Sequence, residues 1–231
     1  MSLYVRCFAD FAIEVDGVPL DLSPLRRRAR TLLRLLAMHA GRPVHRESAI
    51  EALWPEVRLA TARRGLHVAV STLRGFLAAG TGHPLIGRVD EAYRLELPPG
   101  AACDVALFRA AIAGAGRGER AAGALREAVR LYAGDLLPED GPAEWVTRER
   151  SALRHQAAGA AARLAALELE RGAFAEAAEA AARCLQVDEY HDAAWRLLIE
   201  ANRRRGDLMG LARARRDYAL ALAALEGSHE A

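Results

Sequence analysis

Residues 59–77 form the stretch that most constrains the fold, because two kinds of side chain repeat along it with the period of an α-helix. Apolar residues recur every three or four positions, at Ala62, Leu66, Ala69, Leu73 and Leu77. Hydrogen-bonding residues recur with the same spacing on a different face, at Arg63, His67, Ser71 and Arg74. The stretch therefore predicts a helix with one buried face and one donor face. Such a helix fits the major groove of DNA, so we interpret it as a recognition helix.

The composition indicates a folded chain of two domains. Its 231 residues are 52% hydrophobic and 27% charged, which suffices for one large or two small cores. All 32 basic residues are arginine, which we attribute to a compositional bias of the source genome. Residues 1–100 contain 14 arginines and 10 acidic residues, whereas residues 101–231 contain 18 and 20. The basic excess therefore lies with the predicted recognition helix, as phosphate binding requires.

Cysteines and histidines do not predict a metal site. Cys7, Cys103 and Cys184 lie far apart without a Cys-x-x-Cys pair, which favours a reducing compartment, and we expect a cytoplasmic protein. Cys184 and His191 form the nearest ligand pair, but a zinc site needs four donors, so we expect no metal and no other cofactor. We expect no membrane partner, because the chain has neither a long uncharged apolar run nor a signal-peptide pattern.

The sequence also argues against an enzyme. It contains no phosphate-binding glycine loop, no nucleophile beside a credible base and no paired acidic cluster at a strand end. Trp54, Trp145 and Trp195 each lie among apolar helical neighbours, so we interpret them as core residues and not as groups that stack on bases.

The first hundred residues predict a winged helix preceded by a small sheet. Alternating runs at residues 3–8 and 12–15 predict two strands, and Asp16-Gly17 predicts the turn that closes them. Alternation over residues 85–97 around Asp90-Glu91 predicts a second hairpin, which would be the wing.

Two further helices are predicted ahead of the recognition helix. Ser23-Pro24 supplies a helix cap and a first-turn proline, and an apolar stripe follows over residues 25–40. A second helix is predicted over residues 46–54, where Pro55 stops it. The order of sheet, three helices and hairpin is typical of a winged helix.

The second half predicts paired helices that repeat. Gly172 and Gly206 lie 34 residues apart, which is the period of the tetratricopeptide (TPR) repeat, two helices joined at a tight turn. Residues of similar type recur at the same separation, pairing Leu164 with Leu198, Arg171 with Arg205, Phe174 with Leu208 and Ala178 with Ala212. Close packing of the helices is expected at Ala177, Ala178, Ala181 and Ala212.

An earlier helix pair is predicted over residues 104–115 and 119–132, with a turn at 116–118 and an irregular link over 134–142. Stacked pairs form a solenoid whose concave face binds proteins or peptides. The predicted fold class is therefore mainly α with a small β component. A winged helix-turn-helix domain over residues 1–100 is followed by an α-helical TPR-like repeat domain over residues 101–231.

Short motifs follow one another in a characteristic order along nearly the whole chain. In the first half they are RPVHRE at 42–47, IEALWP at 50–55, ATAR at 60–63, VAVSTLR at 68–74 and YRL at 93–95. In the second half they are CDV at 103–105, LYAGDLLP at 131–138, and WV at 145–146 followed by Glu149, Arg150 and Leu153. Together they resemble the streptomycete antibiotic regulatory protein (SARP) family, which joins an OmpR-type winged helix to a bacterial transcriptional activator domain.

The resemblance implies a transcriptional activator that binds direct repeats in double-stranded DNA and recruits RNA polymerase. The predicted major-groove residues are Arg63, Arg64, His67, Ser71 and Arg74. The predicted phosphate contacts are Arg46 at the start of the second helix and Arg88 and Arg94 in the hairpin. The helical repeat domain would mediate self-association, giving a homodimer, or contact the transcription machinery.

The chain departs from the family pattern where DNA would be contacted. Relatives have glycine or basic residues at the hairpin turn, whereas this turn contains Asp90, Glu91 and Ala92. Thr72 and Gly75 stand where relatives often have further arginines, Gly65 costs helix stability, and His45 replaces a Ser or Thr cap on the second helix. These departures predict weaker binding, or binding that depends on a second protomer.

Two alternatives remain open from the sequence. In the first, the winged helix has lost DNA binding and the repeats bind protein partners. In the second, the chain is the regulatory output fragment of a larger multidomain protein. The acidic hairpin turn favours the interaction module, whereas the intact donor face of the third helix opposes it.

Overall fold

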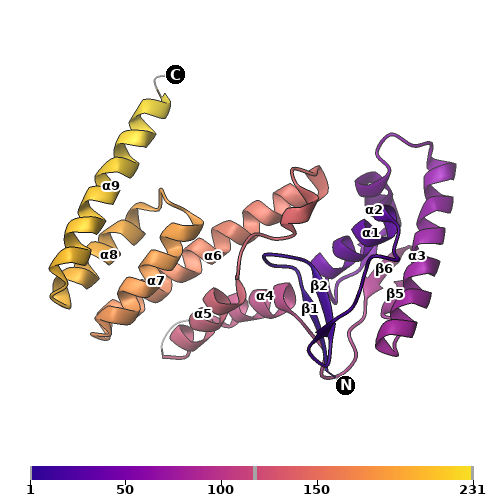
Figure 1. The fold of residues 1–231 in the computed structure, drawn as a ribbon, viewed down its shortest axis with the longest axis horizontal. Helices are drawn as coiled ribbons and strands as arrows, with labels where there is room; N and C mark the ends of the chain where they lie inside the picture. Colours follow the sequence, from indigo (N-terminus) through magenta and orange to yellow (C-terminus); the bar gives the residue numbers. More distant parts are fainter. Residues whose placement is uncertain (1, 117–118, 230–231) are drawn as a thin grey trace. The chain divides into compact units, whose positions relative to one another are not determined.

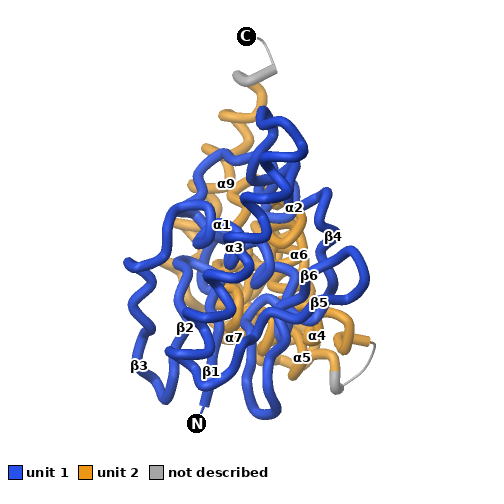
Figure 2. The backbone as a smooth tube through the Cα atoms, turned by 90° about the vertical axis from the view of Figure 1, so that its right-hand side faces the viewer, with its two compact units in different colours: residues 1–108, 133–150 blue, residues 109–132, 151–231 orange. Residues whose placement is uncertain are grey.

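The computed structural model describes residues 2–116 and 119–229 and divides the chain into two compact units. Unit 1 comprises residues 1–108 and 133–150, and unit 2 comprises residues 109–132 and 151–231 (Figure 2). The predicted division at residue 100 is a division along the sequence and stays a prediction. The two units alternate along the chain, because residues 133–150 belong to unit 1.

Unit 1 contains a four-stranded sheet in the order β3-β2-β1-β7. The strands are β1 Leu3–Arg6, β2 Ala12–Val15, β3 Val18–Pro19 and β7 Ala102–Cys103. The predicted strands at the N-terminus are confirmed as β1 and β2, which pair antiparallel, although β1 ends two residues early. β7 pairs parallel to β1, although the two strands lie about a hundred residues apart in the sequence. No local sequence pattern predicts that pairing.

Three helices follow the sheet: α1 Arg27–Met38, α2 Arg46–Leu53 and α3 Leu59–Thr81 (Figure 1). The predicted start of the first helix at Ser23-Pro24 is wrong. Ser23 instead donates its hydroxyl and its backbone N–H to Asp21, at 2.8 and 2.9 Å, and the helix begins at Arg27 without a side-chain cap. A local Asp–Ser turn has replaced the expected cap, because both residue types bond to nearby backbone in turns as readily as at helix ends.

A second sheet completes the winged helix, in the order β4-β6-β5. Its strands are β4 Val44–His45, β5 Ile86–Val89 and β6 Ala92–Leu95. The predicted hairpin is confirmed: β5 and β6 pair antiparallel, and the turn residue Asp90 has φ +50°. β4 leads straight into α2 and pairs with β6, so the sheet register places the start of α2 beside the hairpin turn.

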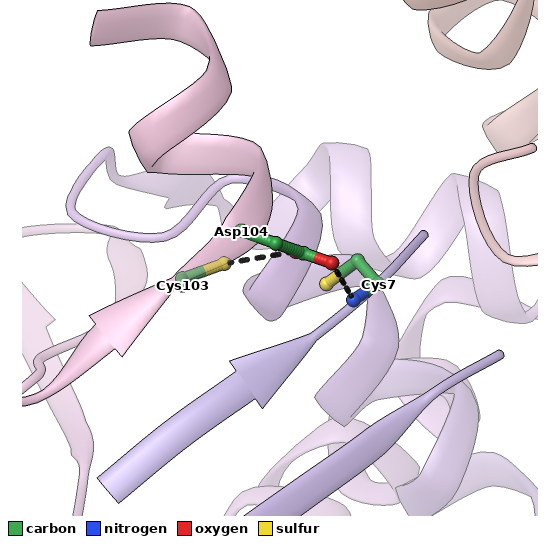
Figure 3. Close-up of side chains that lie close together, drawn as sticks. All are labelled: Cys7, Cys103 and Asp104. Atoms are coloured by element: carbon green, nitrogen blue, oxygen red, sulfur yellow. Dashed lines mark hydrogen bonds between the residues drawn. The ribbon is translucent and has the colours of Figure 1, made fainter. Parts of the chain in front are cut away.

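Asp104 is the first residue of α4 (Asp104–Gly114), and its side chain ties this helix to the residues that follow β1. Its Oδ2 accepts hydrogen bonds from the backbone N–H groups of Cys7 and Phe8, at 2.8 and 2.9 Å, and its Oδ1 accepts one from Val105 at 2.7 Å. Cys7 and Cys103 lie beside this carboxylate as buried free thiols (Figure 3). Three backbone donors account for the buried carboxylate, so the cluster is a structural junction.

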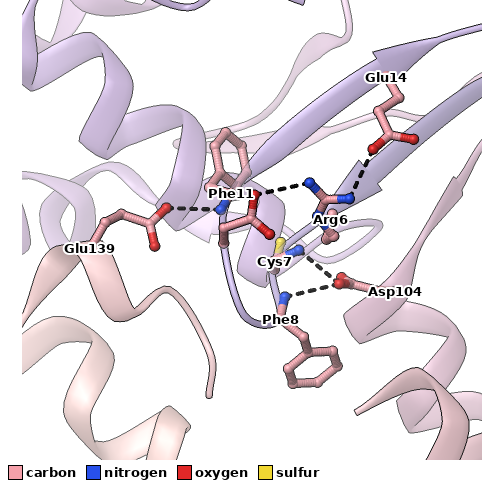
Figure 4. Close-up of polar contacts among 8 residues, drawn as sticks. Arg6, Cys7, Phe8, Phe11, Glu14, Asp104 and Glu139 are labelled. Atoms are coloured by element: carbon pink, nitrogen blue, oxygen red, sulfur yellow. Dashed lines mark hydrogen bonds and ion pairs between the residues drawn. The ribbon is translucent and has the colours of Figure 1, made fainter. Parts of the chain in front are cut away.

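Residues 133–150 complete unit 1 through side chains that reach the segment between β1 and β2 and helix α1. Glu139, in the short 3-10 helix η1 Pro138–Asp140, accepts the N–H of Phe11 at 3.1 Å (Figure 4). Asp140 pairs with Arg34 of α1, with 2.6 Å between Nε and Oδ2 and little exposure of either side chain. Arg150 donates to three carbonyl oxygens of the irregular segment, those of Leu136, Leu137 and Gly141. The predicted irregular link is therefore confirmed, and it is an ordered part of unit 1.

The helices after residue 118 are α5 Glu119–Leu131, α6 Glu144–Glu170, α7 Phe174–Val187, α8 Asp192–Arg204 and α9 Leu208–His229. The predicted turn at 116–118 falls partly on residues 117 and 118, which lie outside the described residues. None of the described helices combines the length and the apolar character that crossing a bilayer would require.

The 34-residue repeat is confirmed at its turns. Gly172 joins α6 to α7 with φ +77°, and Gly206 joins α8 to α9 with φ +75°. After each glycine the next N–H closes the same hydrogen bond to a carbonyl five residues earlier, Ala173 to Glu168 and Asp207 to Asn202. Ala177, Ala178 and Ala181 are buried as predicted, but Ala212 is exposed. On α9 the buried alanine is Ala214, two residues after the predicted position.

Candidate nucleic-acid interface

The two faces predicted for α3 are present in the structure. The predicted apolar residues Ala62, Leu66, Ala69, Leu73 and Leu77 are all buried, together with Val70 and Thr81. Arg63, Arg64, His67 and Ser71 are exposed. Because the buried face anchors α3 in the core, the polar face is held outward along several turns of helix.

Gly65 has a packing role in holding α3 against α2. A Cβ at this position would lie 3.1 Å from the ring of Trp54, which follows the last residue of α2. Trp54 is half-buried and lies under the guanidinium of Arg28, 5.6 Å from the ring centre. The glycine that weakens the isolated helix therefore lets α2 and α3 approach. Trp145 and Trp195 are also half-buried, so the three tryptophans predicted to pack in the core lie at its edge.

Side chains of α3 and the hairpin meet in a shallow hollow of about 260 Å³. Its lining comprises His67, Val70, Ser71 and Arg74 of α3 and Arg88 and Tyr93 of the hairpin. Arg74 is half-buried and donates its Nε–H to the carbonyl of Ile86 at 2.9 Å, so this residue also fastens the hairpin to α3. The structure thus brings together four of the predicted residues: His67, Ser71, Arg74 and Arg88.

The hairpin turn contains an ion-pair cluster. Arg46, the first residue of α2, forms an ion pair with the Glu91 carboxylate, and Arg88 lies 3.4 Å from the same carboxylate. Arg88 also donates its Nε–H to the carbonyl of Asp90 at 2.9 Å. The sequence places acidic residues at this turn, and in the structure the Glu91 side chain is paired with two predicted phosphate contacts.

Arg63 and Arg94 lie apart from the hollow. Arg63 is within 3.9 Å of Glu47 near the start of α2. Arg94 pairs with Glu96 at 2.6 Å. It alternates with Tyr93 along β6, so its side chain leaves the face of the hairpin opposite to that of Arg88 and Tyr93. Six of the eight predicted residues therefore lie on α3 or face it, Arg46 lies at the turn, and Arg94 lies across the hairpin.

Three exposed residues of this surface were not predicted. Val68 is 65% exposed, and Thr72 follows it by one helical turn on the outward side of α3. Arg58 immediately precedes α3 and is also exposed. The signal for Val68 and Thr72 was their spacing of four and eight residues from Arg64, and an apolar group on that face suits a thymine methyl group.

Unit 2 has a groove of its own, of about 550 Å³, lined by α5, α6 and α7. At its base Glu168 is 2% exposed and forms an ion pair with Arg126. Further charged side chains line it, namely Arg130, Glu176, Glu179 and Arg183. The groove combines both signs of charge with apolar surface from Val129 and Leu164, as a peptide-binding surface would.

Fold and surfaces together define a transcriptional regulator of the winged-helix class with a helical repeat domain. The bacterial transcriptional activator domain matches residues 103–226, and the C-terminal domain of transcriptional regulatory proteins matches residues 21–94. The chain belongs to the SARP family of transcriptional regulators. Proteins of this family are regulators and not enzymes.

Two mycobacterial proteins and one solved structure are similar to the chain. The transcriptional regulatory proteins EmbR of Mycobacterium tuberculosis and Mycobacterium bovis are 32% identical to it over 133 residues, which cover 54% of this chain and 34% of theirs. The structure of Mycobacterium tuberculosis EmbR in complex with a low-affinity phosphopeptide matches with a TM-score of 0.76 at 26% identity, covering 96% of this chain and 60% of that one. The matched region therefore spans about a third of the curated relatives.

Proposed function

We propose that the protein is a sequence-specific DNA-binding transcription factor, an activator, that reads the major groove with α3. The observation that carries this proposal is the outward face of α3, where Arg64, His67 and Ser71 stand exposed along successive turns. Arginine bonds guanine bidentately in the major groove, and hydroxyl and imidazole groups bond other base edges. Arg63 and Arg74 border this face, and Arg74 would contact DNA only with the nitrogens that Ile86 leaves unused.

Phosphate contacts are assigned by charge and position. Arg46 and Arg88 lie at the hairpin turn beside α3, and Arg58 precedes α3. Neutralising phosphates with arginine supplies the sequence-independent part of affinity. Arg94 remains a proposed contact only if the DNA surface extends around the edge of the hairpin.

Unit 2 supplies the proposed protein contacts. Its groove between α5, α6 and α7 suits a peptide with both charged and apolar side chains, and RNA polymerase or a second protomer is the proposed partner. A homodimer on direct repeats would double the modest basic charge of each winged helix. We place this activity in the cytoplasm, where bacterial promoters and polymerase are found.

Substitutions on the outward face of α3 test the proposal. Arg64→Ala and Ser71→Ala should each cost about 1–3 kcal/mol of binding free energy at the preferred site and relax sequence preference there. Arg171→Ala removes an equally exposed arginine in unit 2 and is the matched control. Fluorescence anisotropy with labelled duplexes gives the affinities of wild type and the three variants. Equal affinities for wild type, both α3 variants and the control would remove α3 from the interface.

The second candidate function is a protein-interaction module without DNA binding. It is favoured by the ion pairs at the wing, where Glu91 engages Arg46 and Arg88, and by Glu47 beside Arg63. Such a module would bind protein partners through unit 2 and show no duplex binding even at low salt.

A further inference from the structure

The sheet register fixes Glu91 between two arginines. His45 of β4 pairs with Ala92 of β6, so the next residue along the chain, Arg46, comes to lie beside Glu91. The backbone N–H of Arg46 donates to the carbonyl of Glu91 at 2.9 Å. Val89 also pairs with Ala92, which brings Arg88 to the same turn. The backbone position of Glu91 is thus set by strand pairing and does not depend on its own ion pairs.

The carboxylate of Glu91 engages both guanidinium groups as a DNA phosphate would. Both are oxygen anions, and arginine binds either through charge-assisted hydrogen bonds. Arg46 is 35% exposed, Glu91 45% and Arg88 57%, so all three side chains are within reach of a duplex. The Nε of Arg46 is buried and has no hydrogen-bond acceptor among the described residues, so this guanidinium is not saturated by Glu91.

We propose that Glu91 is an intramolecular competitor of DNA phosphate, which holds Arg46 and Arg88 and limits sequence-independent binding until a duplex displaces it. The inference rests on the proposed function. Exposed ion pairs contribute little to folding, so the pair can open at small cost when phosphate arrives. A duplex that positions a phosphate at the turn gains two arginines, whereas a poorly docked duplex does not. Glu91 would therefore widen the gap between specific and non-specific affinity.

The test is Glu91→Gln, with Glu96→Gln as its matched control. Both substitutions remove one negative charge from the hairpin, but Glu96 pairs with Arg94 on the opposite face. The probe is a duplex of random sequence of about 20 base pairs, roughly two helical turns. We expect Glu91→Gln to bind it about three- to tenfold more tightly than wild type, with a salt slope more negative by about 1 to 2. Glu96→Gln should match wild type in slope.

A double substitution tests whether Arg46 is the arginine that Glu91→Gln frees for DNA. Adding Arg46→Ala to Glu91→Gln should cancel most of the gain, and circular dichroism should show all variants folded, because the Arg46–Glu91 backbone hydrogen bond remains. Unchanged or weaker binding by Glu91→Gln, while wild type binds with steep salt dependence, would overturn the competitor role and leave the proposed function standing. Absence of duplex binding by wild type and Glu91→Gln alike at low salt would overturn both.

Discussion

At the scale of single residues, local patterns predicted exposure well and long-range partners poorly. The period along α3 sorted its buried and exposed faces correctly, because residues three and four apart share a face of any helix. The same reasoning missed Asp104, since its donors Cys7 and Phe8 lie far away in sequence. It also missed the ion pair between Glu91 and Arg46, because Arg46 reaches the turn only through the register of β4 and β6.

Asp104 should be the polar side chain on which unit 1 depends most. Asp104→Asn keeps the shape but replaces one acceptor oxygen with a donor, leaving at least one buried N–H of Cys7, Phe8 or Val105 without a partner. We expect a loss of about 2–3 kcal/mol in unfolding free energy, measured by denaturant titration. Asp10→Asn removes an exposed carboxylate and should leave stability unchanged. A similar small effect for both variants would contradict the junction role.

The pH dependence of Asp104 follows from the same geometry. Burial raises the pKa of this carboxyl group above its ordinary value, although the three backbone N–H groups oppose the shift. A raised pKa means that the folded protein binds the proton more tightly than the unfolded chain. Asp104 therefore gives no driving force for acid unfolding, and its cost to folding diminishes as pH falls from its raised folded pKa to the ordinary value of 3.8.

At the scale of elements, most helices and strands could be predicted because amphipathic periods and glycine turns are local signals. The repeat turns at Gly172 and Gly206 are the clearest case, since only the left-handed backbone closes them. The predicted start of α1 was wrong because Ser23, the expected cap, donates its hydroxyl to Asp21 instead. β7 was missed because two residues carry no alternation, and its pairing with β1 is fixed only by the folded unit.

The repeat turns should tolerate no side chain without strain. Gly172→Ala and Gly206→Ala should each lower the unfolding free energy by about 1–2 kcal/mol, because an L residue is disfavoured at positive φ. Gly159→Ala in the exposed interior of α6, where a Cβ meets nothing within 4 Å, should instead stabilise by up to about 1 kcal/mol. Thermal unfolding followed by circular dichroism measures all three, and a loss at position 159 equal to that at the turns would refute the conformational argument.

Asp207 should make the stability of α9 depend on pH. Hydrogen bonding from the N–H of Gly210, with help from Arg205, lowers the pKa of this carboxyl group below its ordinary value of 3.8. Its contribution is complete above that value and is lost as pH falls through the lower folded pKa. The protection factor of the Gly210 amide, which is its hydrogen-exchange rate relative to the intrinsic rate at the same pH, should therefore fall on acidification in wild type, whereas Asp207→Ala should show low protection at every pH. Acid-insensitive protection in wild type would contradict this assignment.

At the scale of the whole molecule, the chain combines an outward-facing helix in unit 1 with a charged groove in unit 2. The sequence predicted the outward face of the helix and a helical repeat domain, and the order of its motifs resembled a family to which the chain belongs. That residues 133–150 belong to unit 1 could not be predicted, because it depends on Asp140 and Glu139 finding partners far away in the sequence, Arg34 and the N–H of Phe11. For the same reason we expect that a fragment ending at residue 100 would lack part of the unit that supports α3.

The most direct test of the central claim is selection of the intact chain against a random duplex library, followed by salt titration of the enriched site. The account predicts enrichment of a repeated motif, with affinity that falls steeply as salt rises, since arginine contacts release counterions from phosphate. The spacing of the repeats would then give the arrangement of protomers on DNA. No enrichment, together with no duplex binding at low salt, would contradict DNA recognition by α3 and leave the protein-interaction module as the function of the chain.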